Sequence, residues 1–199
     1  MSWKDAQKWE TGWWDSCVNT YGEEEKQILY ARKMGLPFFH NRKSPYNINM
    51  DGKSVVDIGG GPTSLLLKCT GLVRGTVVDP LPIPYWVELR YNEVGVYYDK
   101  RPAERFTTDT PYDEAWIYNC LQHTANPKRI VKNALKSAVI VRVFEWVNTR
   151  INEGHPHSFT PELLNKWFGG EGKKETLNGQ ANCYGDCYYG IFIGTGLDS

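Results

Sequence analysis

The sequence predicts an α/β protein with a doubly wound, mostly parallel seven-stranded sheet, helices on both faces and a C-terminal antiparallel hairpin. Two observations lead to this fold class. Short runs rich in Val and Ile alternate with segments of helical pattern through the middle of the chain, and this alternation implies a parallel sheet covered on both faces. The last two runs follow each other with no helix between them, which predicts the hairpin.

Length and composition restrict the class of protein. The chain has 199 residues with 23 basic and 23 acidic side chains, so it lacks the broad basic field that non-specific nucleic-acid binding uses. Its five cysteines are scattered and odd in number, and we recognise no secretory leader, which favours free thiols in a reducing compartment. No apolar run approaches the roughly 20 residues that span a bilayer. We therefore expect a cytoplasmic protein that does not enter a membrane.

The first 36 residues carry a helical, amphipathic pattern and many aromatic side chains. Half of the eight Trp residues lie within the first 14 positions. Acidic residues at 23–25 suit a helix N-terminus, because they offset the positive end of the helix dipole. The aromatic residues have two interpretations: a helix that covers one end of the sheet, or a lid that lines a pocket. We expect residues 1–50 to form a helical and aromatic lid, and residues 51–199 to form one globular ligand-binding domain.

The remaining elements follow along the chain. Residues 38–51 are polar and rich in turn formers, so they predict a loop. Strands are expected at residues 54–58, 75–79, 95–98, 115–119, 138–146, 176–182 and 187–193. Helices are expected at 65–69, 85–93, 127–136 and 163–168. The last two have clear start signals, because Asn126 precedes Pro127 and Thr160 precedes Pro161, each a capping side chain followed by a proline at the first turn.

Three consecutive glycines, Gly59 to Gly61, lie between the first strand of the domain and its first expected helix. A backbone without Cβ atoms can approach a ligand closely, and a helix N-terminus offers it free N–H groups. Asp79 ends the second strand, where an acid can accept hydrogen bonds from both hydroxyls of an adenosine ribose. Asp57, just before the glycines, suits a ligand with a positive amino group better than a pyrophosphate, which it would repel.

Three stretches of the chain carry a family resemblance: Asp57 to Thr63, Val77 to Pro80, and Asn119 to His123. Together they resemble the class I S-adenosylmethionine-dependent methyltransferases, most of all the small-molecule branch, whose sheet ends in an antiparallel hairpin. The resemblance covers roughly residues 50 to 168, and its first stretch is the most specific. The family's glycine loop usually ends in a further glycine where this chain has Thr63, a residue that can cap the helix start.

The resemblance implies S-adenosylmethionine as cofactor. The loop backbone would pass its methionine part, Asp57 would lie near its amino group, Asp79 would hold its ribose hydroxyls, and Asn119 would lie near its sulfonium. Ala103 and Glu104 match the place where a backbone N–H meets the adenine, although Asp99 could equally serve. The expected cofactor-binding residues are Asp57, Gly59, Gly60, Gly61, Thr63, Asp79, Pro80, Ala103, Glu104 and Asn119.

Histidines supply the candidates for catalysis. Methyl transfer from a sulfonium is an in-line displacement, so a general base is needed only if the nucleophile must lose a proton. Of the four histidines, His40 precedes the domain, whereas His123, His155 and His157 follow the fourth and fifth strands. We take these three as candidate acid–base or substrate-binding residues, because histidine titrates near neutrality. A structural, hydrogen-bonding role remains the alternative for each.

Other kinds of site are disfavoured. Cys183 and Cys187 have no second metal-ligand pair nearby, and Glu145 with Asn148 forms no carboxylate cluster, so no metal is expected. Enzymes of the family that methylate nucleic-acid amino groups carry an Asn/Asp-Pro-Pro-aromatic box after the fourth strand. The chain has Asn119-Cys120-Leu121-Gln122 there, and Ser44-Pro45-Tyr46 lies ahead of the first strand.

The sequence thus predicts a methyltransferase that acts on an oxygen or nitrogen of a small-molecule acceptor. The acceptor pocket is expected between the N-terminal aromatic helices, residues 80–85 and residues 155–160. Two alternatives stay open: an S-adenosylmethionine-binding partner protein without catalysis, and an NAD-dependent oxidoreductase. The oligomeric state is also open, a homodimer included.

Overall fold

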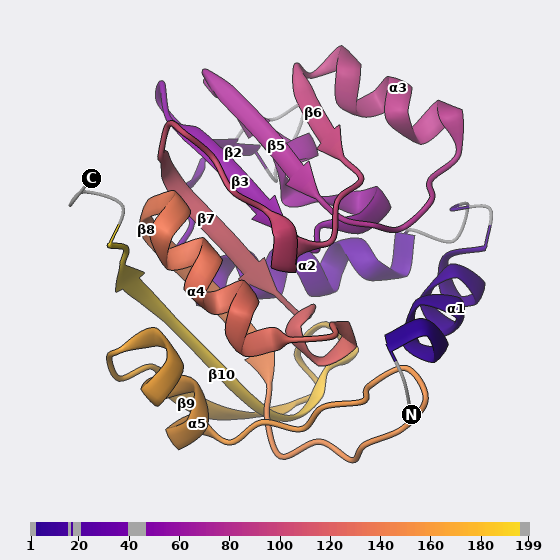
Figure 1. Ribbon diagram of the computed structural model, residues 1–199, viewed down its shortest axis with the longest axis vertical. Coiled ribbons are helices and arrows are strands. Elements are labelled where there is room, and N and C mark those ends of the chain that lie inside the picture. The colour runs from indigo at the N-terminus through magenta and orange to yellow at the C-terminus, as the bar shows by residue number, and fades with distance from the viewer. Residues whose placement is uncertain (1–2, 16, 18–20, 40–46, 196–199) are drawn as a thin grey trace.

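A seven-stranded sheet runs through the middle of the fold (Figure 1). The structure is a computed structural model, which describes residues 3–15, 17, 21–39 and 47–195. The strands are β3 (Ser54–Ile58), β5 (Arg74–Val78), β6 (Val96–Asp99), β7 (Tyr112–Tyr118), β8 (Ala138–Trp146), β9 (Lys173–Asn178) and β10 (Tyr184–Ile193). Their order is β6-β5-β3-β7-β8-β10-β9. The first five are parallel, and β10 pairs antiparallel with β8 and β9, which confirms the predicted fold class.

Helices cover both faces of this sheet. They are α1 (Trp3–Trp14), α2 (Tyr21–Lys33), α3 (Tyr85–Glu93), α4 (Pro127–Ser137) and α5 (Pro161–Phe168). In Figure 1, α4 and α5 lie in front of the sheet, α2 lies behind it, and α1 lies beside it. The predicted start signals are confirmed, since the Asn126 side chain accepts a hydrogen bond from the Arg129 N–H and the Thr160 side chain accepts one from the Leu163 N–H. Among the described residues, no helix has the length and apolar character to cross a membrane.

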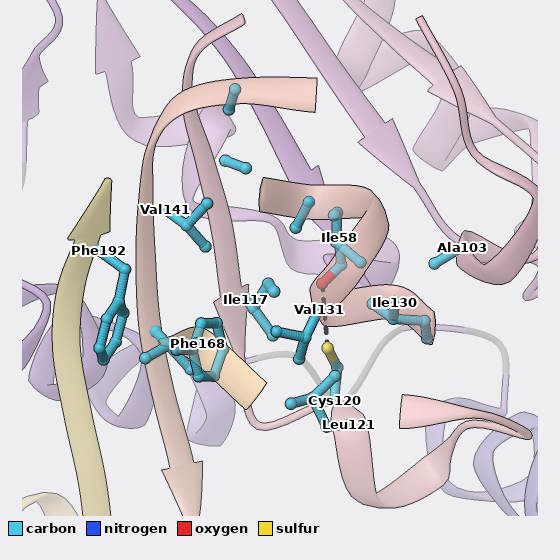
Figure 2. Close-up of a cluster of buried hydrophobic side chains, with 14 of the residues drawn as sticks. Ile58, Ala103, Ile117, Cys120, Leu121, Ile130, Val131, Val141, Phe168 and Phe192 are labelled. Carbon is cyan, nitrogen blue, oxygen red and sulfur yellow. Dashed lines mark hydrogen bonds between the residues drawn. The ribbon is translucent and has the colours of Figure 1, made fainter. Parts of the chain in front are cut away.

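Two apolar layers result from the alternation of side chains along each strand. Figure 2 shows one of them, in which Ile58, Ile117 and Val141 of the sheet face Val131 of α4 and Phe168 of α5. These side chains are buried. On the opposite face the intervening strand residues meet α2 and α3.

The N-terminal region contributes to that second layer. The Tyr30 ring of α2 stacks on Phe144 of β8, with ring centroids 4.1 Å apart, and Met34 is fully buried in the same cluster. The Arg142 guanidinium donates to the backbone oxygen of Met34 at 2.8 Å and to the Glu114 carboxylate at 2.7 Å. The second layer therefore includes residues of α2, and Trp14 of α1 packs against it.

The structure corrects the segment after β3. Instead of the expected helix over 65–69, two short 3₁₀ turns cover Gly61–Thr63 and Leu65–Lys68, and β4 (Cys69–Thr70) follows. Ser64 separates the turns with an extended backbone. Its N–H donates to the Tyr91 hydroxyl and that of Leu65 donates to the Tyr118 hydroxyl, both at 3.0 Å. Side chains from α3 and β7 therefore satisfy these two backbone N–H groups.

The expected loop over 38–51 is also corrected in part. It contains β1 (Phe38–Phe39) and β2 (Asn47–Asn49), which form a small three-stranded sheet with β4. Residues 40–46 lie outside the described residues, and with them His40 and the Ser44-Pro45-Tyr46 stretch.

Candidate active site

A cavity of about 620 Å³ opens where β3, β5 and β7 end. Ligands in open α/β sheets bind at this edge, and the volume is within the usual range of small-molecule sites. One wall consists of strand-end residues: Ile58, Gly59, Gly60, Gly61, Val78, Asp79, Pro80, Tyr118, Asn119 and Cys120. The opposite wall comes from α1 and α2, and a third from the turn between β9 and β10.

The glycine loop requires glycine for geometric reasons. A Cβ at Gly59 would lie 2.4 Å from the Cβ of Cys120, and one at Gly60 would lie 2.6 Å from Oδ2 of Asp57. Gly61 has a φ of +54°, and only Oδ2 of Asp79 lies within 4 Å of a Cβ placed there. The loop is therefore closed toward the protein at Gly59 and Gly60 and open toward the cavity at Gly61.

Asp57 supports this loop from below. Its Oδ2 accepts hydrogen bonds from the Ser64 hydroxyl and the Tyr118 hydroxyl, both at 2.5 Å. The carboxyl group is fully buried and does not line the cavity. Burial raises its pKa to about 7, although both hydroxyl hydrogen bonds act to lower it. Asp57 thus holds the loop in shape and does not itself meet the space where a ligand would lie.

Asp79 and Pro80 do line the cavity. The Gly61 N–H donates to Oδ2 of Asp79 at 3.0 Å, and the Leu81 N–H donates to Oδ1 at 2.8 Å. Burial raises the pKa of Asp79 to about 6. The carboxylate is therefore fixed at the mouth of the glycine loop, with lone pairs left for a ligand hydroxyl.

Thr63 has a different place from the expected one. It does not line the cavity, and its hydroxyl accepts a hydrogen bond from the Gln27 side chain at 2.7 Å. Ser64, not Thr63, caps the following turn by accepting the Leu66 N–H. The contact nevertheless matters for the cavity, because Gln27 is one of its lining residues.

Ala103 and Glu104 lie on the cavity wall. The Glu104 carboxylate accepts the N–H groups of Ala125 and Asn126 at 2.9 and 3.0 Å, so it also positions the start of α4. The alternative, Asp99, does not line this cavity and is bound by Arg101.

Asn119 closes the strand-end wall. Its φ is +50°, a left-handed conformation that Asn tolerates better than most residues. Its Oδ1 accepts a hydrogen bond from Gln122 at 2.9 Å, and both side chains line the cavity.

Two of the three candidate histidines line the cavity and the third does not. His123 and His155 line the cavity, with ring centroids 4.6 Å apart. His157 does not line it; its Nε2 lies 2.8 Å from the backbone oxygen of Thr124 and its ring stacks on Phe159. Placement therefore supports a ligand-facing role for the first two and a structural role for His157.

The pKa values of His123 and His155 shift in opposite directions. Burial acts to lower the pKa of His123, but the Glu10 carboxylate, the Gly154 backbone oxygen and the Glu145 charge together outweigh burial, and the net shift is upward. Burial, followed by the charge of His123, lowers the pKa of His155. The two neighbouring histidines thus differ in pKa, with that of His123 raised and that of His155 lowered.

Several lining residues have no signal in the local sequence. They are Glu10 of α1, Tyr30 of α2, Trp146 of β8 and the turn from Asn182 to Asp186. Trp9 is one of the expected aromatic lid residues, and its ring stacks on His123 at 6.4 Å. Within the described part of the chain, no group of three or more His, Cys, Asp or Glu side chains could hold a metal ion.

Comparison with known proteins identifies the fold. No protein-family model and no curated protein sequence matches the chain. Among solved structures, the N-methyltransferase NodS from Bradyrhizobium japonicum, in complex with S-adenosyl-l-homocysteine, is similar with a TM-score of 0.58, 12% identity and coverage of 91% of this chain and 93% of that one. The 1,6-didemethyltoxoflavin-N1-methyltransferase of Burkholderia thailandensis, with bound 1,6-didemethyltoxoflavin and S-adenosylhomocysteine, gives a TM-score of 0.59, 14% identity and coverage of 97% of this chain and 88% of that one.

The fold is thus that of the class I S-adenosylmethionine-dependent methyltransferases. One further structure of similar fold is the [4+2]-cyclase SpnF, with a TM-score of 0.56, 15% identity and coverage of 79% of this chain and 61% of that one. Proteins of this fold are thus named for different reactions, so the fold alone does not identify the reaction. The residues of the site have to do so.

Proposed function

We propose that this protein transfers a methyl group from S-adenosylmethionine to an oxygen or nitrogen of a small molecule. The observation that carries the proposal is the hydrogen bond from the Gly61 N–H to Asp79 at the mouth of the cavity. It holds a glycine loop and a carboxylate side by side at the ends of adjacent parallel strands. One backbone segment can then pass the methionine part of the cofactor while the acid accepts the ribose hydroxyls.

The residues present fit this cofactor. Gly61 leaves open space toward the cavity and Asp79 keeps free lone pairs. Ala103 and Glu104 line the same cavity, and we propose this segment as the neighbour of the adenine. Asn119 and Gln122 offer side-chain amides near the loop. When bound, the cofactor supplies a methyl group activated by a sulfonium; the protein holds both reactants in line and excludes water.

We propose a small molecule as methyl acceptor and the cytoplasm as the place of action. The cavity of about 620 Å³ is covered by α1, whose Trp9 and Trp14 side chains line it, and such enclosure suits a ligand that is largely buried. The balanced charge of the chain argues against nucleic acid as acceptor.

Two other functions compete with this one. One is an S-adenosylmethionine-binding protein without methyl transfer, which the similarity to a [4+2]-cyclase supports only in that a protein of this fold is named for another reaction. The other is an NAD-dependent oxidoreductase. The sequence argues against it because Asp57 would repel a pyrophosphate, but Asp57 is buried beneath the loop and would not directly face one, so that argument is weaker. Titration with NADH, followed by its fluorescence, separates this alternative from the proposal.

Isothermal titration calorimetry with S-adenosylmethionine tests the cofactor. We expect binding to the wild type and a loss of about tenfold to a hundredfold in Asp79→Asn, because a carboxylate hydrogen-bonded to a hydroxyl contributes about 1.5–3 kcal/mol. Asp109→Asn, at an exposed position outside the cavity, is the matched control and should bind as the wild type does. Absence of binding, or equal binding by all three proteins, would overturn the proposal.

A further inference from the structure

Glu10 of α1 helps to hold the ring proton of His123 on its Nδ1 atom. The Nδ1 atom of His123 lies 2.7 Å from the backbone oxygen of Gly154 and 3.0 Å from Oε1 of Glu10. Both partners can only accept a hydrogen bond, so Nδ1 must carry the proton. In the neutral ring the lone pair is then on Nε2.

Glu10 is itself held in position. Its Oε2 accepts a hydrogen bond from the Trp14 indole of α1 at 3.2 Å, and its Oε1 contacts His123, so each oxygen of the carboxylate has a partner. The Glu10 and His123 side chains are 17% and 12% exposed, and both line the cavity. No hydrogen bond found among the described residues uses Nε2 of His123.

The surrounding wall favours a flat, aromatic ligand. The indoles of Trp9, Trp14 and Trp146 and the phenol ring of Tyr30 line the cavity with the Glu10–His123 pair. Trp9 lies nearly parallel to the His123 ring, at an interplanar angle of 15°. Aromatic faces bind aromatic ligands by offset stacking or edge contacts. The wall therefore favours a flat ligand, and His123 supplies a group that can accept a proton from it.

We propose that Glu10 and His123 form a dyad that accepts the proton of an aromatic hydroxyl, so that the methyl acceptor is a phenol. Glu10 is the positioning residue and His123 is the base. The inference rests on the proposed methyl transfer and narrows it to oxygen. A phenolic hydroxyl needs such a base near neutral pH, whereas a neutral amine attacks through a lone pair that it already has.

The proposed step is balanced. The O–H bond of the phenol breaks and its proton goes to Nε2 of His123. The oxygen forms a bond to the methyl carbon of S-adenosylmethionine, and the S–CH₃ bond breaks with its electron pair going to sulfur. The products are the methyl ether, S-adenosylhomocysteine and a His123 imidazolium paired with Glu10; release of that proton to water restores the dyad.

Four titratable groups act on His123 from the elements around it. They are Glu10 of α1, Glu145 of β8, Asp79 after β5, and His155 of the segment after β8. The Glu10 contact, together with the Glu145 charge, raises the pKa of His123 against the effect of burial. A raised pKa makes His123 a stronger base and restricts its basic form to the alkaline side of the transition.

Nitrogen-15 NMR of the histidine rings tests the dyad without any acceptor. In the wild type we expect the neutral His123 ring to carry its proton on Nδ1. Its pKa should fall in Glu10→Gln and return toward the wild-type value in Glu10→Asp, while Glu93→Gln at an exposed position leaves it unchanged. A proton on Nε2, or a pKa unaffected by Glu10→Gln, would overturn the dyad.

Methyl transfer from labelled S-adenosylmethionine tests the acceptor class. The probes are matched pairs of phenols and anilines with the same ring substituents. We expect methylated phenols, with kcat reduced about a hundredfold or more in His123→Gln, and a pH profile whose acidic limb moves to lower pH in Glu10→Gln. Transfer to anilines alone, transfer to no phenol, or full activity of His123→Gln would overturn the inference.

Calorimetry separates failure of this inference from failure of the proposed function. A protein that binds S-adenosylmethionine but methylates only anilines keeps the proposed function and loses the phenol assignment. A protein that does not bind S-adenosylmethionine loses both.

Discussion

Arg142 and Glu114 form a buried ion pair on adjacent strands, with Nε of the guanidinium 2.7 Å from Oε2 of the carboxylate. The Trp116 indole also donates to Glu114, at 2.9 Å, and Lys53 donates to its other oxygen at 2.8 Å. Because Arg142 also binds the backbone oxygen of Met34 after α2, the pair joins the N-terminal helical region to the sheet.

Removal of this arginine should destabilise the whole fold. Arg142→Met leaves Glu114 buried with a weakened set of partners, and we expect the free energy of unfolding to fall by about 3–5 kcal/mol. Lys100→Met is the matched control, because Lys100 pairs with Glu88 and their side chains are 61% and 28% exposed, a surface pair that contributes about 0–1 kcal/mol. Urea denaturation measures both, and losses of equal size would contradict the prediction.

Glu114 should also make the free energy of unfolding depend on pH in the acidic range. Burial acts to raise the pKa of Glu114, but the hydrogen bonds and charges of Arg142 and Lys53 outweigh it and lower the pKa to about 2. A group with a lowered pKa stabilises the fold fully above its unfolded value, about 4.3, and loses that contribution as pH falls toward the folded value. The free energy of unfolding should therefore decline between these two pH values, and less steeply in Glu114→Gln.

The glycine loop can be tested at Gly60. The Cβ of Gly60→Ala would lie 2.6 Å from Oδ2 of Asp57 and 3.0 Å from the Ser64 side chain, so we expect a loss of about 1–3 kcal/mol and weaker S-adenosylmethionine binding. Gly12→Ala is the control, since nothing lies within 4 Å of its Cβ and alanine in a helix should add about 0.5–1 kcal/mol. Thermal unfolding and calorimetry check both. A Gly60→Ala protein of wild-type stability would show that the loop can shift freely.

The position of α1 depends on a second glycine. A Cβ at Gly154 would lie 2.7 Å from the Trp9 indole, so Gly154→Ala should displace Trp9 and loosen α1 over the cavity. We expect faster tryptic cleavage within α1, after Lys4 and Lys8, and weaker ligand binding, with a change of only about 1–2 kcal/mol in global stability. Limited trypsin digestion at native temperature measures the opening. Unchanged cleavage would mean that Trp9 does not hold the lid.

The Glu10–His123 pair should add stability on the acidic side of neutrality. Because the folded pKa of His123 is raised, the contribution is fully present below its unfolded value, about 6.5, and is lost as pH rises through the folded value. The difference in unfolding free energy between the wild type and Glu10→Gln should therefore be larger near pH 6 than near pH 9. A difference that grows with pH would reverse the assigned sign.

Much of the fold follows from local sequence. The Val- and Ile-rich run of β8 and the capped helices after Asn126 and Thr160 lie where predicted, because hydrophobic period and capping are local properties. The segment after Gly61 was predicted wrongly as a helix. Its N–H groups at Ser64 and Leu65 donate to the hydroxyls of Tyr91 and Tyr118, which come from elements far along the chain.

The same division applies to the site. By itself the sequence determined the strand–glycine–strand pattern, and so the edge of the sheet where Gly61 and Asp79 meet. Only the tertiary structure decided that Asp57 lies beneath the loop, that His157 lies outside the cavity, and that Glu10 reaches His123. A strand end is fixed by local periodicity, whereas the partner of a side chain depends on how distant elements pack.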